Sequence, residues 1–179
     1  LNLNYRLMSL DGKQEFGLYD LKAVHFKGKH RIEIIQKVSI KHRGRKVRVE
    51  SSVFYPEDPN SSMKEGRART WVDGTLCMKG EVTVGKDKVR TKCTGYLEQR
   101  TGEAIDPPRL YDSDLPRPKG PMATLPGLLV LGSGFQPKPG KRSDIALAEF
   151  PDYVEAPELI KIREGTVLVR SKPEKNGEF

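Results

Sequence analysis

The sequence predicts an all-β protein, built as a curved antiparallel meander that forms a half-barrel or open barrel with a Pro-rich loop and a short helical lid. Apolar and polar residues alternate at period two over long runs in the first half of the chain. Glycine dipeptides such as Asp11-Gly12 and Asp73-Gly74 separate these runs and suit tight hairpin turns. Several runs exceed the usual strand length of about five or six residues, which favours a curved sheet over a flat sandwich.

The alternation defines seven strands that should pair in sequence order. Their expected ranges are 3–9, 14–26, 29–42, 45–55, 66–72, 75–84 and 88–97. The 179 residues are expected to form a single domain, 1–179. In it the meander occupies 1–97, the Pro-rich loop and lid occupy 98–140, and returning strands occupy 141–179.

A turn at Arg43-Gly44 sets one register that can be tested against the apolar pattern. It places Ile40 opposite Val47, Val38 opposite Val49, Ile34 opposite Val53, Ile32 opposite Tyr55 and Gln36 opposite Ser51. A turn at Lys27-Gly28 then places Tyr19 opposite Gln36. We therefore expect Tyr19, Gln36 and Ser51 to form a polar band across an apolar face.

Two further features concern strand phase. Phe16 and Leu18 would pair with residues of the first strand, but they alternate in the opposite phase to the other apolar residues of 14–26. A bulge near Tyr19-Asp20 would reconcile the two phases. The turn at Asp73-Gly74 pairs Trp71 with Leu76 and Arg69 with Met78, so Arg69 is expected to point to the apolar side.

After Leu97 the regular alternation stops. Eight prolines in residues 106–140 exclude central strands there. The apolar run Leu125 to Leu131 is expected to form a short helix, either as a lid over the barrel or as a loop packed on the sheet as core. Strand-like sequence resumes at "RSDIALAEF" and at "ELIKIREGTVLVR". We expect the second of these segments to form a hairpin that turns at Glu164-Gly165.

The chain ends raise two expectations. Because the sequence begins "LNLNYRL" without a Met, we expect that a leader has been removed. The sequence "KPEKNGEF" suggests a turn that leads into another strand, so we expect either that the chain is cut there or that its last strand is missing. An unpaired C-terminal edge would invite strand addition by a partner.

Composition and charge limit the partners. The formal net charge is +8, which favours polyanions, acidic surfaces or solubility alone. The basic run at 41–48, "KHRGRKVR", lacks interleaved aromatic residues, so we expect a solvated hairpin tip and no specific nucleic-acid recognition. No apolar run approaches the roughly 18 residues that a membrane-spanning helix needs.

Metal and disulfide chemistry have weak support. His25 and His30 would lie opposite each other, but a third ligand is missing, so no metal site and no cofactor are expected. Cys77 and Cys93 would face each other if the hairpin is centred on Gly85. A four-residue loop at 85–88 instead pairs Val84 with Val89, matches apolar residues better and keeps the cysteines apart; both registers stay open.

Enzymatic signals are also weak. The sequence holds no Gly-x-Ser-x-Gly elbow, no phosphate-binding glycine loop and no Cys-x-x-Cys pair. Asp112 and Asp114 lie close together, and we expect them to be turn formers in a Pro-rich loop.

The order of a β-meander, then "LPGLLVLG", then "KPGKRSDIALAEF", then "IREGTVLVR" resembles secreted bacterial half-barrel domains of unknown function. Those domains are similar in architecture to envelope lipoprotein carriers, in which a curved antiparallel sheet capped by helices encloses an apolar cavity. The resemblance implies a periplasmic or cell-envelope location and an apolar or acylated ligand. No functional residue carries over by motif.

These observations lead us to expect a non-enzymatic cell-envelope protein that binds an apolar or acylated molecule in a β-barrel-like cavity. The alternative is a structural or interaction module that binds anionic surfaces or polysaccharide through its basic face. An inward Arg69 would need an acidic head group as its partner. The expected ligand-binding residues are Tyr19, Ile32, Ile34, Gln36, Val38, Val49, Ser51, Val53, Arg69, Trp71, Leu128 and Leu131.

Overall fold

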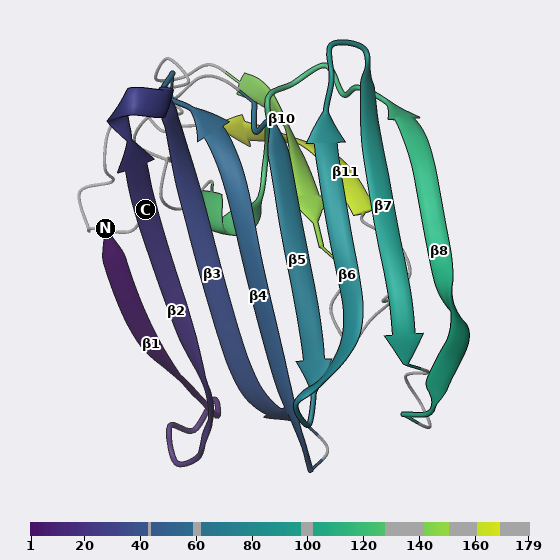
Figure 1. Cartoon of the computed structure of the whole chain (residues 1–179). Helices are drawn as coiled ribbons and strands as arrows, with labels where there is room; N and C mark the ends of the chain where they lie inside the picture. The colour runs from purple at the N-terminus through teal and green to yellow at the C-terminus, as the bar shows by residue number, and fades with distance from the viewer. Residues whose placement is uncertain (43, 59–61, 98–101, 128–141, 151–160, 169–179) are drawn as a thin grey trace, which may run out of the picture.

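The first two-thirds of the chain form one long antiparallel meander (Figure 1). In this computed structural model all residues are described except 43, 59–61, 98–101, 128–141, 151–160 and 169–179. Eight strands pair in sequence order. They are β1 (Asn2–Met8), β2 (Glu15–Phe26), β3 (Arg31–His42), β4 (Arg45–Pro56), β5 (Glu65–Val72), β6 (Thr75–Val84), β7 (Lys88–Leu97) and β8 (Ala104–Pro116), with a 3-10 turn, η1 (Lys27–Lys29), between β2 and β3.

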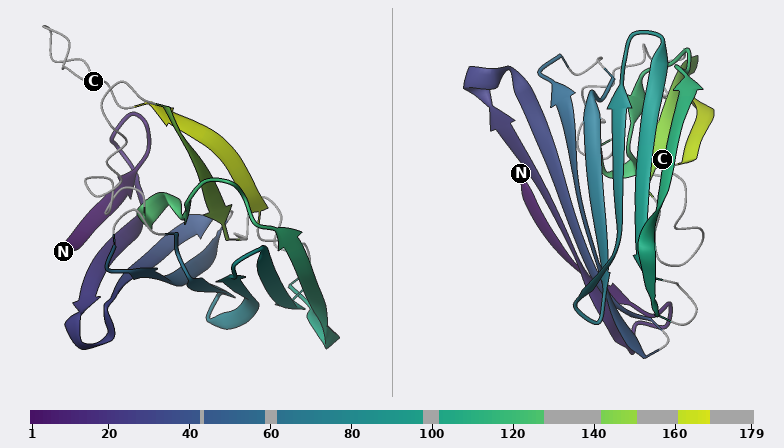
Figure 2. Two further views of the ribbon diagram at one scale, coloured as in Figure 1. Left: turned by 90° about the horizontal axis from the view of Figure 1, so that it is seen from above. Right: turned by 45° about the vertical axis from the view of Figure 1, so that its right-hand side comes forward.

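A second, smaller sheet lies against one face of the meander. It has the order β11-β10-β9, made of β9 (Met122–Ala123), β10 (Arg142–Glu149) and β11 (Lys161–Leu168). Figure 2 shows that the large sheet is strongly curved and open, and that the small sheet lies on its concave side. We call that side the inner face and the opposite side the outer face. The predicted all-β fold with an open, curved meander is confirmed.

The strand predictions hold for β1 to β7 and for the two returning strands β10 and β11, and they fail at residues 104–116 and at the predicted turn inside β11. The seven expected strands match β1 to β7 within about two residues at each end. The predicted hairpin turn at Glu164-Gly165 is wrong, because both residues lie inside β11 and pair with Ala146 and Ile145 of β10. The predicted short helix begins at Leu125 as expected, since the chain is helical from Leu125 to Gly127, but Leu128 and Leu131 fall outside the described residues.

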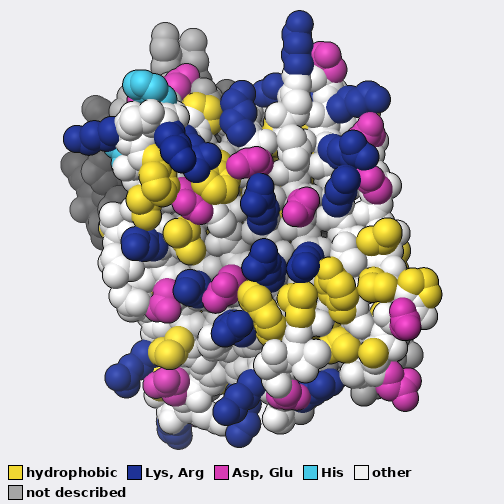
Figure 3. Space-filling view, in the orientation of Figure 1, with side chains coloured by type: hydrophobic (Ala, Val, Ile, Leu, Met, Phe, Trp, Pro, Cys, Tyr) yellow, Lys and Arg dark blue, Asp and Glu magenta, His cyan; other side chains and the backbone are white. Residues whose placement is uncertain are grey.

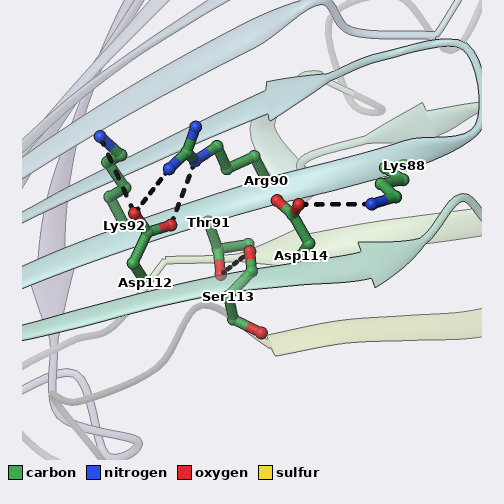
Figure 4. Close-up of polar contacts among 7 residues, drawn as sticks. All are labelled: Lys88, Arg90, Thr91, Lys92, Asp112, Ser113 and Asp114. Carbon is green, nitrogen blue, oxygen red and sulfur yellow. Dashed lines mark hydrogen bonds and ion pairs between the residues drawn. The ribbon is translucent and has the colours of Figure 1, made fainter.

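Residues 104–116 form a strand where the prolines predicted a loop. β8 pairs with β7 alone within the meander, so it is an edge strand and its prolines need not donate to a second neighbour. Asp112 and Asp114 are therefore strand residues and not turn formers. Figure 4 shows their side chains pointing toward the cations of β7.

Ion pairs fasten β8 to β7. Asp112 binds Arg90 through both carboxylate oxygens, with Nε at 3.1 Å and Nη2 at 2.8 Å, and Lys92 Nζ lies 3.9 Å away. Lys88 Nζ approaches Asp114 at 3.6 Å (Figure 4). Opposite charges on facing positions, as for Lys92 and Asp112, or on diagonal positions stabilise a pair of strands, and charged side chains also disfavour pairing of the edge with other strands.

The registers test the hairpin arguments directly. Every pair predicted between β3 and β4 is confirmed, including Gln36 opposite Ser51. The β2–β3 register differs by two residues because η1 lengthens the turn, so Tyr19 lies opposite Val38 and Leu21 opposite Gln36. The polar band therefore consists of Gln36 and Ser51, whose side chains form a hydrogen bond of 3.3 Å, and Tyr19 is not part of it.

The expected bulge near Tyr19-Asp20 is not where the sheet is irregular. The β1–β2 ladder shifts between Leu7 and Met8, and β2 keeps a single phase through its pairing with β3. As a result Phe16 and Leu18 lie on the outer face, on the opposite side from Tyr19.

The core lies between the inner face and the small sheet. Ile34 and Val53 of the meander pack in one buried cluster with Met122, Ile145 and Ala146. Tyr55 is 1% exposed, and its hydroxyl accepts the backbone N–H of Thr124 at 3.0 Å. Further pairing of Met63 N–H with the Met122 carbonyl at 2.7 Å ties the segment after β8 to the middle of the large sheet.

The cysteines are free and buried. Val84 pairs with Val89, as the four-residue loop predicted, and Cys93 therefore lies opposite Gly80 and apart from Cys77. Burial raises the pKa of the Cys77 thiol.

Candidate functional site

The structure places most of the predicted ligand-binding residues together on the inner face of β2, β3 and β4. Ile34, Ser51 and Val53 are buried, and the two aliphatic side chains belong to the core cluster under the small sheet. The half-buried members of the set are Tyr19, Ile32, Gln36, Val38 and Val49. This group is one continuous surface, and its centre is already filled by protein.

Arg69 and Trp71 lie on the other side of the sheet. A register irregularity between Thr70 and Trp71 makes Thr70 the partner of Met78, so the predicted pairing of Arg69 with Met78 is wrong. Arg69 instead faces Glu50 on one neighbouring strand and Lys79 on the other. Arg69 is exposed, and it needs no buried acidic partner.

Trp71 helps to form a groove of about 420 Å³ on the outer face. One row of facing residues crosses four strands, running from Leu18 through Ser39 and Arg48 to Trp71. Because Ser39 is small, the row is hollow between the Leu18 side chain and the Arg48–Trp71 pair. Local side-chain size and strand parity thus produce the groove.

The next row toward the β3–β4 turn adds charge. Lys41 and Lys46 face each other across β3 and β4, and Phe16 of β2 lines the same groove. Figure 3 looks onto this outer face and shows Lys and Arg side chains distributed among hydrophobic ones. The groove therefore combines apolar walls with several cations.

Arg48 and Trp71 form the most defined contact of the groove. The Arg48 guanidinium carbon lies 4.2 Å from the centre of the Trp71 ring, a cation–π distance. Arg48 Nε is also 3.9 Å from a Glu50 oxygen, a long and partly exposed ion pair that adds little. The indole is thus held against β4 as one wall of the groove.

Sequence reasoning missed this site for a specific reason. The basic run at 41–48 has no aromatic residue inside it, but the sheet brings Phe16 and Trp71 beside it from β2 and β5. The signal that could have found the site is the pairing of Arg48 with Trp71. This pairing follows from the β4–β5 register once the Trp71 side chain is assigned to the outer face of the sheet.

A second polar cluster lies at the opposite end of the sheet. His25 Nε2 and His30 Nδ1 contact different oxygens of Glu57, the second at 2.8 Å. The predicted direct pairing of the two histidines is wrong, because His25 lies opposite Ile32. Hydrogen bonds from His30 and then His25 lower the pKa of Glu57. Within the described part of the chain no group of three or more His, Cys, Asp or Glu is arranged to hold a metal ion.

The side chains that line the groove define which chemical groups it could contact. Its described lining offers ammonium, guanidinium and hydroxyl groups with apolar walls, and it includes no carboxylate, imidazole or thiol. Such a set can hold an apolar group and an anion, and it lacks a side chain suited to take up a proton near neutral pH.

Comparison with known protein families, curated proteins and solved structures finds no match for this chain. Among the described residues, no helix has the length and apolar character needed to span a membrane.

Proposed function

We propose that this protein is a non-enzymatic binding protein for an apolar or acylated molecule, and that the ligand lies in the outer-face groove. The observation that carries the proposal is the hollow row of Leu18, Ser39, Arg48 and Trp71. The apolar residues of the inner face are a weaker candidate, because Ile34 and Val53 already pack against the small sheet.

The dimensions of the groove suit a small molecule. Ligand sites in proteins commonly measure roughly 300–1,000 Å³ and combine apolar walls with a few polar groups. At about 420 Å³ the groove is large enough for one acyl chain or ring system. Burial of apolar ligand surface, at about 25 cal/mol per Å², would provide the driving force.

The proposed setting is the periplasm or cell envelope, in keeping with the resemblance to half-barrel carriers. The relationship to that class of domain is likewise part of the proposal. Fractionation of cells that express the gene tests the location, and recovery in the cytoplasmic fraction would contradict it.

Native mass spectrometry tests the binding function. The purified protein should carry a bound mass that is lost on denaturation, or should gain one after incubation with decanol. Leu18→Gln should weaken decanol binding about fivefold to tenfold, because it removes apolar contact area from one wall. Leu110→Gln is the matched control, since Leu110 is an exposed leucine of β8 outside the groove.

The results separate the two functional classes. An apo mass that stays unchanged with decanol, or equal losses in both variants, would contradict the groove as an apolar site. In that case binding to anionic surfaces or polysaccharide through the basic face becomes the better account, and such binding should collapse with added salt.

A further inference from the structure

We infer that the groove selects an anionic single-chain amphiphile, whose charged head group lies between Lys41 and Lys46 and whose chain lies along Leu18 and Trp71. This inference rests on the proposed function and adds the chemical class of the ligand and the residues that recognise its charge.

The first support is the placement of the two lysines. Lys41 and Lys46 are direct cross-strand partners near the end of the β3–β4 hairpin, and both line the groove. Facing residues in an antiparallel pair have Cβ atoms roughly 4.5–5.5 Å apart, and like charges at such positions destabilise the sheet. An anion between the two ammonium groups would remove that repulsion.

The second support is that the neighbouring carboxylates are engaged elsewhere. Asp73 accepts Arg45 Nε at 2.9 Å and the backbone N–H of Lys46 at 2.8 Å. Glu50 lies 3.8 Å from Lys37 Nζ and 3.9 Å from Arg48 Nε. Within the described residues, neither the Lys41 nor the Lys46 ammonium forms an ion pair with a carboxylate. Neither ammonium is thus taken up by an ion pair, although the hydrogen bond from Arg45 and, to a lesser extent, the Lys46 charge lower the pKa of the Asp73 carboxyl.

The third support is the position of the apolar walls beside the lysines. Leu18 and the Arg48–Trp71 pair lie in the row next to Lys41 and Lys46, so an apolar chain can leave the charged row and continue over Ser39. A bilayer surface presents a plane of head groups, whereas a groove with two walls encloses a single chain. The observations therefore favour a monomeric amphiphile over a membrane surface.

The chain carries its own probe for this site. Trp71 is the single tryptophan, and it lines the groove, so its fluorescence reports occupancy directly. The intact protein would be titrated with decanoate and with decanol below their aggregation limits. These two ligands share the same chain length and differ in the charge of the head group. We expect decanoate to bind about tenfold more tightly, and its affinity to fall with added salt while that of decanol does not.

Variants assign the preference to residues. Lys41→Gln combined with Lys46→Gln should reduce decanoate affinity to that of decanol, and should leave decanol binding unchanged. The control combines Lys86→Gln with Lys119→Gln, which removes the same net charge at exposed positions outside the groove. This control should keep the preference for decanoate.

The outcomes distinguish the two proposals. Equal affinity for decanoate and decanol in the natural sequence, or a preference that survives in the Lys41/Lys46 variant, would overturn the anion inference and leave the apolar site intact. If neither amphiphile changes Trp71 fluorescence, both proposals fail. A response to anionic phospholipid vesicles without a response to decanoate would overturn the monomeric ligand in favour of membrane docking.

Discussion

Glu57 joins two histidines of the β2–β3 region to the end of β4. Its carboxylate contacts His30 and His25, and the hydrogen bonds from these two side chains lower its pKa. A carboxyl group whose pKa is lower in the folded than in the unfolded state stabilises the fold above its unfolded pKa of about 4.3. That contribution is lost as the pH falls through the folded pKa.

Glu57→Gln should therefore lower the urea midpoint at about pH 6 and have a smaller effect at about pH 3, because the contribution of the carboxylate is lost as the pH falls through its lowered folded pKa. Urea unfolding followed by circular dichroism at both pH values checks this. Asp87→Asn, in the exposed β6–β7 turn, is the control and should show no such pH dependence. A Glu57→Gln effect of equal size at both pH values would show that charge is not the cause.

At the scale of elements, the β7–β8 ion pairs should decide how firmly the edge strand is held. Asp112→Asn removes the carboxylate that binds Arg90 twice and Lys92 once (Figure 4). We expect backbone amides of β8 to exchange hydrogen severalfold faster, while β3 and β4 keep their protection. Hydrogen exchange with mass spectrometry measures this.

Asp114→Asn provides the comparison for Asp112→Asn. Asp114 has one longer contact with Lys88, so its removal should affect β8 less. Equal exchange in both variants would mean that backbone pairing alone holds the edge strand.

The strands themselves were largely predictable, since alternation and glycine turns mark β1 to β7. The failures have local physical causes. The 3-10 turn η1 lengthens a turn that looked like a two-residue hairpin and shifts the β2–β3 register by two residues. β8 was hidden by prolines that an edge strand tolerates. The β10–β11 pairing depends on contacts distant in sequence, and Glu164-Gly165 suggested a turn that is not there.

The candidate site was less predictable than the strands, because it depends on how elements combine. The β4–β5 register, which pairs Glu50 with Arg69 and Arg48 with Trp71, decides that the Arg69 and Trp71 side chains lie on the outer face and not in the core. The groove also requires residues from β2, β3, β4 and β5 to meet in one row. Sequence reasoning identified the basic run and Trp71 separately, and only the assembled sheet joins them.

At the scale of the whole molecule, the small sheet should depend on close packing at Gly66. A Cβ atom at this position would lie 2.7 Å from Cζ of Phe150, which follows β10, and 3.1 Å from Cγ1 of Val82. Gly66→Ala should therefore displace Phe150 and reduce the free energy of unfolding by about 1–3 kcal/mol. Urea unfolding measures this loss.

Gly95→Ala is the matched control for Gly66→Ala, because a Cβ atom at Gly95 meets nothing within 4 Å. That change should leave stability unchanged or raise it slightly, since alanine restricts the unfolded chain. Equal effects of the two changes would mean that strand propensity, and not packing on Phe150, sets the cost.

The hydrogen bond from Thr124 to Tyr55 has a consequence for the order in which the chain matures. It joins residues 69 positions apart, whereas the hairpins of the meander close over short distances. As the chain leaves the ribosome, the hairpins can pair before Met122, Ala123 and β10 have been synthesised. During that interval Ile34, Val53 and Tyr55 lie uncovered on the inner face. The nascent chain is then a sheet with an apolar side, which is the stage at which a chaperone would protect it from aggregation.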